Sequence, residues 1–265
     1  MKKAGLITSF SPPFFPLLPI LPTAKNLTKI TTIKIKASST TDNSTVEEIR
    51  VCTNRTCRRQ GSLDILQILS GISPPSLSVN SCGCLGRCGA GPNVFVLPQG
   101  VFVGHCGTAS KAAHLMASSL LVYGDDGEFE RSCRECLEAL ALRKRAEDEM
   151  EKGNFDKALV LLSQAIDLKP FGGVHIMYKS RSTARLAMGN ISEALEDAKE
   201  ALRLAPKYSQ AYICHGDALM AMEQFDGADK SYAMALELEP SLRRSMSFKA
   251  RIAVLQEKLT PANSA

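Results

Sequence analysis

Residues 153–170 read GNFDKALVLLSQAIDLKP, and the same pattern returns as GNISEALEDAKEALRLAP at 189–206 and EQFDGADKSYAMALELEP at 223–240. The segments begin 36 and 34 residues apart, and each has two alanines and a final proline at matching positions. Alanine lets two antiparallel helices approach closely, and the proline ends the second helix of each pair. The pattern predicts an all-α solenoid of three helix pairs over 139–259, closed by a cap helix.

The first helix of each predicted pair also has a pattern of its own. A large residue is followed four positions later by a small one, in the pairs Leu142 and Ala146, Tyr178 and Ser182, and Tyr212 and Gly216. Together with the alanines and prolines, this resembles tetratricopeptide repeats. The resemblance implies a concave groove that binds a protein client, and we expect four residues to contribute to it: Arg143, Tyr178, Arg181 and Tyr212. The alternative is a rigid spacer.

One subclass of these repeats grips the acidic C-termini of chaperones with Lys, Asn and Arg. This sequence has Arg143, Glu147, Ser180, Gln210 and Cys214 at the corresponding positions. Only Arg143 fits, and Glu147 would repel a carboxylate. We therefore do not expect a receptor for acidic tails, and we expect Cys214 to be a buried, inert thiol.

A second, smaller domain is predicted ahead of the repeats, at residues 46–122. Its expected β-α-β-β-α order has strands at 46–51, 77–81, 93–97 and 101–103, and helices near 63–69 and 108–121. Five of the nine cysteines of the chain fall between Cys52 and Cys88. In a reducing compartment such a cluster indicates metal or redox chemistry. A bound metal cluster would also help to stabilise so small a core.

The cysteine spacing is Cys52-x4-Cys57 and Cys84-x3-Cys88, followed by Gly-x-Gly-Pro-Asn-Val. This resembles the thioredoxin-like [2Fe-2S] ferredoxins, including the small cluster subunit of NADH dehydrogenase. The resemblance implies an α+β, thioredoxin-like fold in which these four cysteines ligate iron, two per iron. The chemistry agrees, because two sulfide-bridged irons need four soft thiolates. The glycines of the loop let backbone N–H groups approach the sulfurs.

Other cysteine chemistry stays open. Cys82 adds a fifth thiol and is an alternative ligand. Zinc is the main rival metal because four thiolates suit it, although structural zinc sites usually have CxxC spacing. A thiol or disulfide role, or a fold that has lost its cluster, are further alternatives. Cys133 and Cys136 form a CxxC on the predicted linker helix, where we expect bystanders rather than a redox pair.

The first 41 residues have six lysines and no acid, and they are rich in Ser, Thr and Pro. This composition is typical of a plastid transit peptide, with a mitochondrial presequence as the alternative. Without those lysines the net charge of +5 becomes −1, so we expect no nucleic-acid partner. No apolar run reaches 18 residues, so no membrane span is expected. The predicted organisation is transit peptide 1–37, linker 38–45, cysteine domain 46–122, linker helix start 123–138, repeats 139–259 and tail 260–265.

No nucleotide-binding loop, zinc-protease helix or nucleophile elbow occurs, so we do not expect an enzyme. The sequence predicts a scaffold of the chloroplast stroma that binds a client and carries a [2Fe-2S] cluster for redox-linked assembly or sensing. One alternative is a soluble electron carrier docked to a redox partner. Another is a zinc-stabilised or metal-free repeat adaptor. The ferredoxin resemblance also admits a homodimer.

Overall fold

The computed structural model describes residues 46–120 and 126–260, which fall in one compact unit that spans Asn43–Ala265. The predicted transit peptide (1–37), the polar linker (38–45) and residues 261–265 of the predicted tail lie outside the described residues. Across the described ranges, no helix is both long and apolar enough to span a bilayer.

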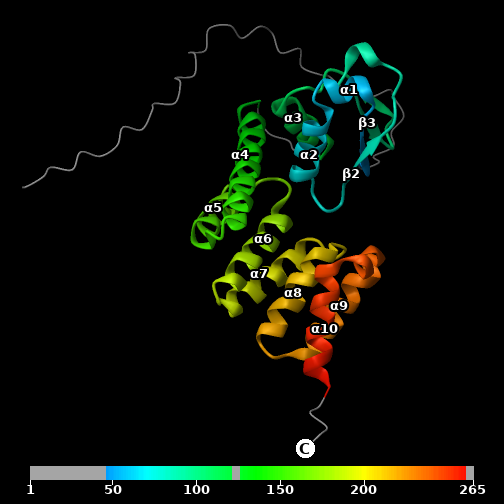
Figure 1. The fold of residues 1–265 in the computed structure, drawn as a ribbon. Coiled ribbons are helices and arrows are strands. Elements are labelled where there is room, and N and C mark those ends of the chain that lie inside the picture. The colour runs from blue at the N-terminus through cyan, green and yellow to red at the C-terminus, as the bar shows by residue number, and fades with distance from the viewer. Residues whose placement is uncertain (1–45, 121–125, 261–265) are drawn as a thin grey trace, which may run out of the picture. The chain divides into compact units, whose positions relative to one another are not determined.

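Four strands form one mixed sheet in the order β2-β1-β3-β4 (Figure 1). They are β1 (Glu48–Cys52), β2 (Ser78–Cys82), β3 (Val94–Leu97) and β4 (Val101–Val103). β1 runs parallel to β2 and antiparallel to β3, and β3 and β4 form a hairpin. Ile49 and Val51 alternate along β1 and are fully buried, as a strand with one covered face requires. The parallel register places Cys52 directly opposite Cys82 at one end of the sheet.

Helices complete this α/β unit: the two expected from the sequence are present, and two short ones, α1 (Arg55–Arg59) and η1 (Cys88–Ala90), are additional. α1 and α2 (Ser62–Ile72) connect β1 to β2, η1 lies in the glycine-rich loop, and α3 (Ala109–Ser119) follows the hairpin. The Thr108 hydroxyl caps α3 by accepting a hydrogen bond from the Lys111 N–H at 3.3 Å. Apolar residues of α2 and α3 pack with the strands in one core.

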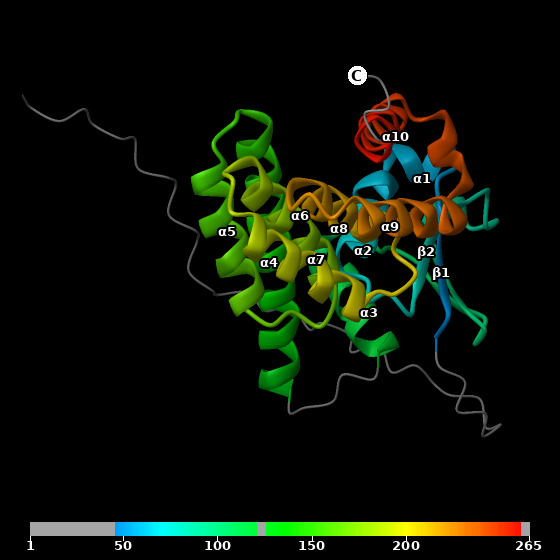
Figure 2. The same ribbon diagram turned by 90° about the horizontal axis from the view of Figure 1, so that it is seen from below.

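The rest of the described chain is helical. Its elements are α4 (Asp126–Glu151), α5 (Phe155–Asp167), α6 (Val174–Ala187), α7 (Ile191–Leu204), α8 (Ser209–Ala221), α9 (Phe225–Leu238), η2 (Pro240–Arg244) and α10 (Met246–Leu259). Successive helices from α4 to α9 contact one another and lie side by side (Figure 2). The repeated alanines are all fully buried: Ala158, Ala165, Ala194, Ala201, Ala228 and Ala235. The predicted helix pairs are therefore present, with the small residues at their contacts.

Helix α4 belongs to two cores. Its first half contributes Cys133, Cys136 and Leu140 to the core of the α/β unit. Its second half contributes Ala146 to the core of the first repeat. A Cβ atom at Gly71 of α2 would lie 2.6 Å from Leu140 Cδ1, so the bare backbone of α2 is what allows this approach. The described part of the segment 123–138 was predicted as the start of a linker helix. It supplies Cys133 and Cys136 to the core of the α/β unit.

Candidate functional sites: the paired thiols and the repeat groove

Four cysteines meet at one end of the sheet. Cys52 ends β1, Cys57 lies in α1, and Cys84 and Cys88 lie in the loop after β2. The Sγ atoms of Cys84 and Cys88 are 3.7 Å apart on the exposed loop. Cys52 and Cys57 are each 1% exposed and contact each other through their side chains. The structure therefore places the four predicted ligands as two pairs, one exposed and one buried.

Hydrogen-bond donors already point at these sulfurs. The Gly86 N–H donates to Cys84 Sγ at 3.4 Å, and the Asn93 side-chain amide donates to Cys57 Sγ at 3.6 Å. Gly86 has a φ of +81°, a conformation that glycine adopts without strain. Such donors stabilise negative charge on sulfur, which is the form that ligates metal.

The two buried thiols differ in acidity. Burial acts to raise the pKa of Cys52, but N–H groups of Asn54 and Leu85 and the neighbouring Cys57 lower it, and the net shift is downward. Burial dominates at Cys57 and raises its pKa, with Cys52 adding to the rise. The two thiols of the pair are therefore shifted in opposite directions, Cys52 by its hydrogen-bond donors and Cys57 by its burial.

Cys82, the fifth thiol, lies beside this site. It is half-buried, and burial followed by the nearby Cys52 raises its pKa. Its carbonyl accepts hydrogen bonds from the Thr53 N–H and hydroxyl, at 3.0 and 3.2 Å, which fix its backbone at the strand end. Within 46–120 and 126–260, no three side chains of Cys, His, Asp or Glu gather closely enough to hold one metal ion.

The other thiols are buried in apolar surroundings. Burial raises the pKa of Cys106 and of Cys133 to about 11, and that of Cys136 to about 12. Cys133 and Cys136 are core residues of the α/β unit, in keeping with the expectation of an unreactive pair. The pKa of Cys214 is likewise raised by burial.

Arg143, the one residue that matches an acidic-tail clamp, is covered. Its side chain is 10% exposed, lies beside Gly71 of α2, and donates from Nη1 to Glu147 Oε1 at 3.0 Å. The nearby His175 has its pKa lowered to about 4, first by burial and then by the charge of Arg143. Helix α2 of the α/β unit therefore covers the Arg143 guanidinium.

The other three predicted groove residues contact helices of the array itself. Arg181 donates from Nε and Nη2 to the two carboxylate oxygens of Asp197 at 2.8 and 2.7 Å, and from Nη1 to Ser163 Oγ at 3.3 Å. Its guanidinium also lies over the ring of Tyr178, 5.2 Å from the centroid. Tyr212 is half-buried against the core of the third repeat. Arg181 thus links α6 to α5 and α7.

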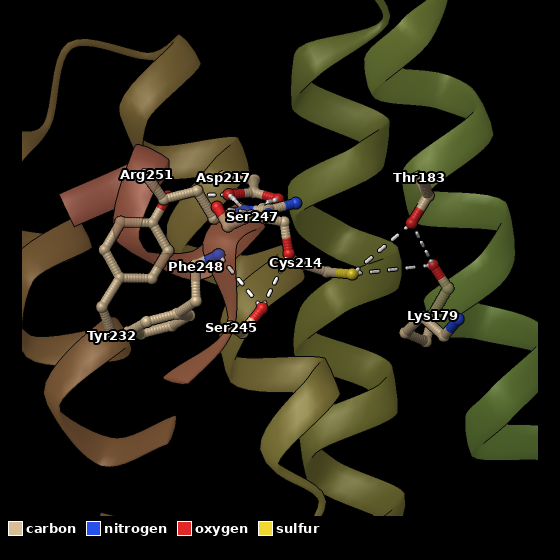
Figure 3. Close-up of polar contacts among 9 residues, drawn as sticks. All are labelled: Lys179, Thr183, Cys214, Asp217, Tyr232, Ser245, Ser247, Phe248 and Arg251. Carbon is tan, nitrogen blue, oxygen red and sulfur yellow. Dashed lines mark hydrogen bonds and ion pairs between the residues drawn. The ribbon is translucent and has the colours of Figure 1, made fainter. Parts of the chain in front are cut away.

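The last repeat and the cap helix are joined by a polar network (Figure 3). Asp217 of α8 accepts hydrogen bonds from the Tyr232 hydroxyl at 2.7 Å and from Arg251 Nε at 2.7 and 3.0 Å. On the adjacent face of α8, Cys214 Sγ lies 3.5 Å from the Thr183 hydroxyl, and Cys214 is 7% exposed. The network connects α8, α9 and α10 and leaves Cys214 enclosed.

Sequence reasoning gave no separate role to several of these residues. Asp197 and Asp217 contact partners 16 and 34 residues away, which no local pattern relates. Asn93 was part of the Gly-Pro-Asn-Val motif, but its contact with Cys57 was not predicted. The signal that marks it is a polar residue immediately before an apolar strand, next to the ligand loop.

Comparison with known proteins finds relatives, although no family model matches the chain. The STIP1 homolog of Dictyostelium discoideum is 35% identical over 88 residues, which are 33% of this chain and 15% of that protein. The heat shock protein STI1 of Saccharomyces cerevisiae is 33% identical over 88 residues, which are also 33% of this chain and 15% of that protein. The small glutamine-rich tetratricopeptide repeat-containing protein 2 of Mycosarcoma maydis is 26% identical over 133 residues, 50% of this chain and 36% of that protein. The C-terminal half is a tetratricopeptide-repeat array.

Solved structures also resemble the chain. The first tetratricopeptide domain of Spaghetti (RPAP3), bound to an HSP90 peptide, has a TM-score of 0.43 at 23% identity and covers 47% of this chain and 95% of that domain. The tetratricopeptide domain of Sgt2 from Aspergillus fumigatus has a TM-score of 0.42 at 27% identity. The match covers 48% of this chain and 88% of that domain.

The prediction of a tetratricopeptide-repeat array is thus confirmed. Tetratricopeptide arrays stack helix pairs so that each repeat contacts its neighbours and the array forms an extended concave surface. The chain spans only 15% of the length of each of its first two relatives.

Proposed function

We propose that this protein is an adaptor whose repeats bind a protein client while its α/β unit carries a [2Fe-2S] cluster, acting in redox-linked assembly or sensing with that client. One observation carries the proposal: four thiols from three separate segments form two pairs at one end of the sheet. Cys52 and Cys57 are in contact, and Cys84 and Cys88 have their Sγ atoms 3.7 Å apart.

The residues present fit such a group. Two irons bridged by sulfides take two thiolates each, and the thiols here are already arranged in twos. N–H donors reach a sulfur of each pair, at Cys84 and at Cys57. Bound there, a [2Fe-2S] cluster supplies one-electron transfer. The chain buries one pair and keeps the other at the surface, where a redox partner can approach within contact distance of Cys84 and Cys88.

The repeats supply the client site. Because Arg143 is covered and paired with Glu147, the client is recognised by features other than a terminal carboxylate. The lysine-rich and acid-free first 41 residues support import into the plastid stroma, with the mitochondrion as the alternative destination.

The test is the visible spectrum of residues 38–265 purified without oxygen, with iron, sulfide and zinc measured on the same sample. We expect visible bands that dithionite bleaches and about two irons and two sulfides per chain. Cys84→Ser should abolish them, whereas Cys106→Ser, a buried thiol outside both pairs, should leave them unchanged. Cys82→Ser decides whether the fifth thiol serves as a ligand.

A colourless protein that contains zinc or no metal would overturn the cluster and leave a zinc-stabilised or metal-free adaptor. A soluble electron carrier is the second candidate, favoured by the exposure of Cys84 and Cys88. A carrier would exchange electrons reversibly with a reductase over many turnovers. An assembly or sensing factor would instead form a stable complex with its client.

A further inference from the structure

Asn93 touches all three segments that bear the paired thiols. Its backbone carbonyl accepts a hydrogen bond from the Cys52 N–H at 2.9 Å. Its side-chain amide donates to Cys57 Sγ at 3.6 Å and to the carbonyl of Arg87, the residue before Cys88, at 2.7 Å. One residue therefore connects the end of β1, helix α1 and the ligand loop.

The orientation of this amide is fixed by its partners. A carbonyl oxygen accepts but never donates, so the nitrogen of Asn93 has to face Arg87 and, with it, Cys57. The side-chain oxygen has no hydrogen-bond partner among the described residues, and Asn93 is only 1% exposed. An unpaired buried acceptor is unfavourable. The amide is nevertheless present here, and its nitrogen donates to both Cys57 Sγ and the Arg87 carbonyl.

We propose that Asn93 is the positioning residue of the thiol site: it holds the three ligand-bearing segments in register and donates a hydrogen bond to the sulfur of Cys57. The inference rests on the proposed cluster for its electronic part. A donor to a ligating sulfur stabilises the more negative, reduced form and raises the reduction potential. The mechanical part, the register of the segments, applies with or without a bound group.

The experiment compares the chain with Asn93→Asp, Asn93→Ser and a control, Asn80→Ser. Aspartate keeps the shape of asparagine and removes the N–H donors. Serine is shorter and uncharged, so it keeps the test valid if a buried carboxylate prevents folding. Asn80 lies in the same sheet, where its amide donates to Glu48 at 3.0 Å on the exposed surface.

Two readouts are measured on each protein. The first is the reduction potential, from a dithionite titration followed by visible absorption and electron paramagnetic resonance. We expect both Asn93 variants to have lower potentials and altered g-values, and Asn80→Ser to match the parent. The second is amide hydrogen exchange of residues 83–92 in the metal-free chain, which we expect to accelerate in both Asn93 variants and to remain unchanged in Asn80→Ser.

The outcomes separate this inference from the proposed function. If the parent chain builds no cluster but loop exchange accelerates, the cluster is refuted and the positioning role of Asn93 stands. If the parent builds the cluster and the Asn93 variants match Asn80→Ser in potential and spectrum, the electronic role is refuted. Unchanged loop exchange in both Asn93 variants would overturn the positioning role.

Discussion

Asp197 should be essential to the stability of the repeat array. Its side chain is 4% exposed and accepts from Arg181 through both oxygens and from Arg185 Nη1 at 2.7 Å. Asp197→Ala removes a nearly buried charge and leaves two guanidinium groups without their carboxylate. Breaking a fully buried pair in this way costs about 3–5 kcal/mol. Because the two arginine side chains keep 15% and 21% of their exposure, we place the loss near the lower end, at about 3 kcal/mol.

Urea unfolding followed by circular dichroism at the helix band measures this loss. With a slope of about 2 kcal/mol per molar urea, the midpoint should fall by about 1.5 M. Asp229→Ala, an exposed aspartate in the next helix pair, is the matched control and should shift the midpoint little. Arg181→Met and Arg185→Met combined with Asp197→Leu should recover most of the loss, since apolar side chains need no charge partner. A loss below about 1 kcal/mol in Asp197→Ala would refute the structural role assigned to Arg181.

Three further predictions follow from other contacts. Gly216→Ala should destabilise the chain by about 2 kcal/mol in urea unfolding, because the new Cβ would lie 2.5 Å from the buried Tyr232 ring; an unchanged midpoint would contradict that packing. The lowered pKa of His175 means that the folded state takes up its proton only near pH 4, whereas an unfolded histidine does so near 6.5. Stability should therefore fall by about 3 kcal/mol as pH decreases through this window, and His175→Gln should flatten the curve. A peptide ending in EEVD should show no saturable binding below about 1 mM by calorimetry, because Arg143 is covered and Glu147 repels carboxylates; micromolar binding would contradict this.

The repeats were predictable because close helix packing restricts particular positions to small residues. Ala158, Ala194 and Ala228 occur at a fixed place in each segment, and all three are fully buried. The strands of the α/β unit were also predictable, because short apolar runs that are bounded by turn residues usually form β-strands. The four cysteines were singled out by their spacing and by resemblance; the structure places Cys84 beside Cys88 and Cys52 beside Cys57, and their role as ligands stays a prediction.

Contacts between distant segments were not predictable. Arg181 was expected to contribute to the groove by resemblance to tetratricopeptide repeats, and its contact with Asp197, which is buried on the following helix, was not predicted. Cys133 and Leu140 lie on one stripe of α4, yet nothing in the sequence shows that the surface covering this stripe belongs to α2 and α3. The burial of Arg143 was not predictable for the same reason, because the residue beside its guanidinium, Gly71, belongs to the distant helix α2.

Helix α4 sets limits on how this protein can be divided. A fragment that ended before the helix would leave the α/β core without Cys133, Cys136 and Leu140, and a repeat fragment that began at residue 139 would expose Leu140 to water. Because one continuous helix completes both cores, we expect the sheet and the first repeat to unfold in a single transition. The repeats therefore cannot be exchanged for another array as a separate cassette unless the replacement brings an equivalent helix with it.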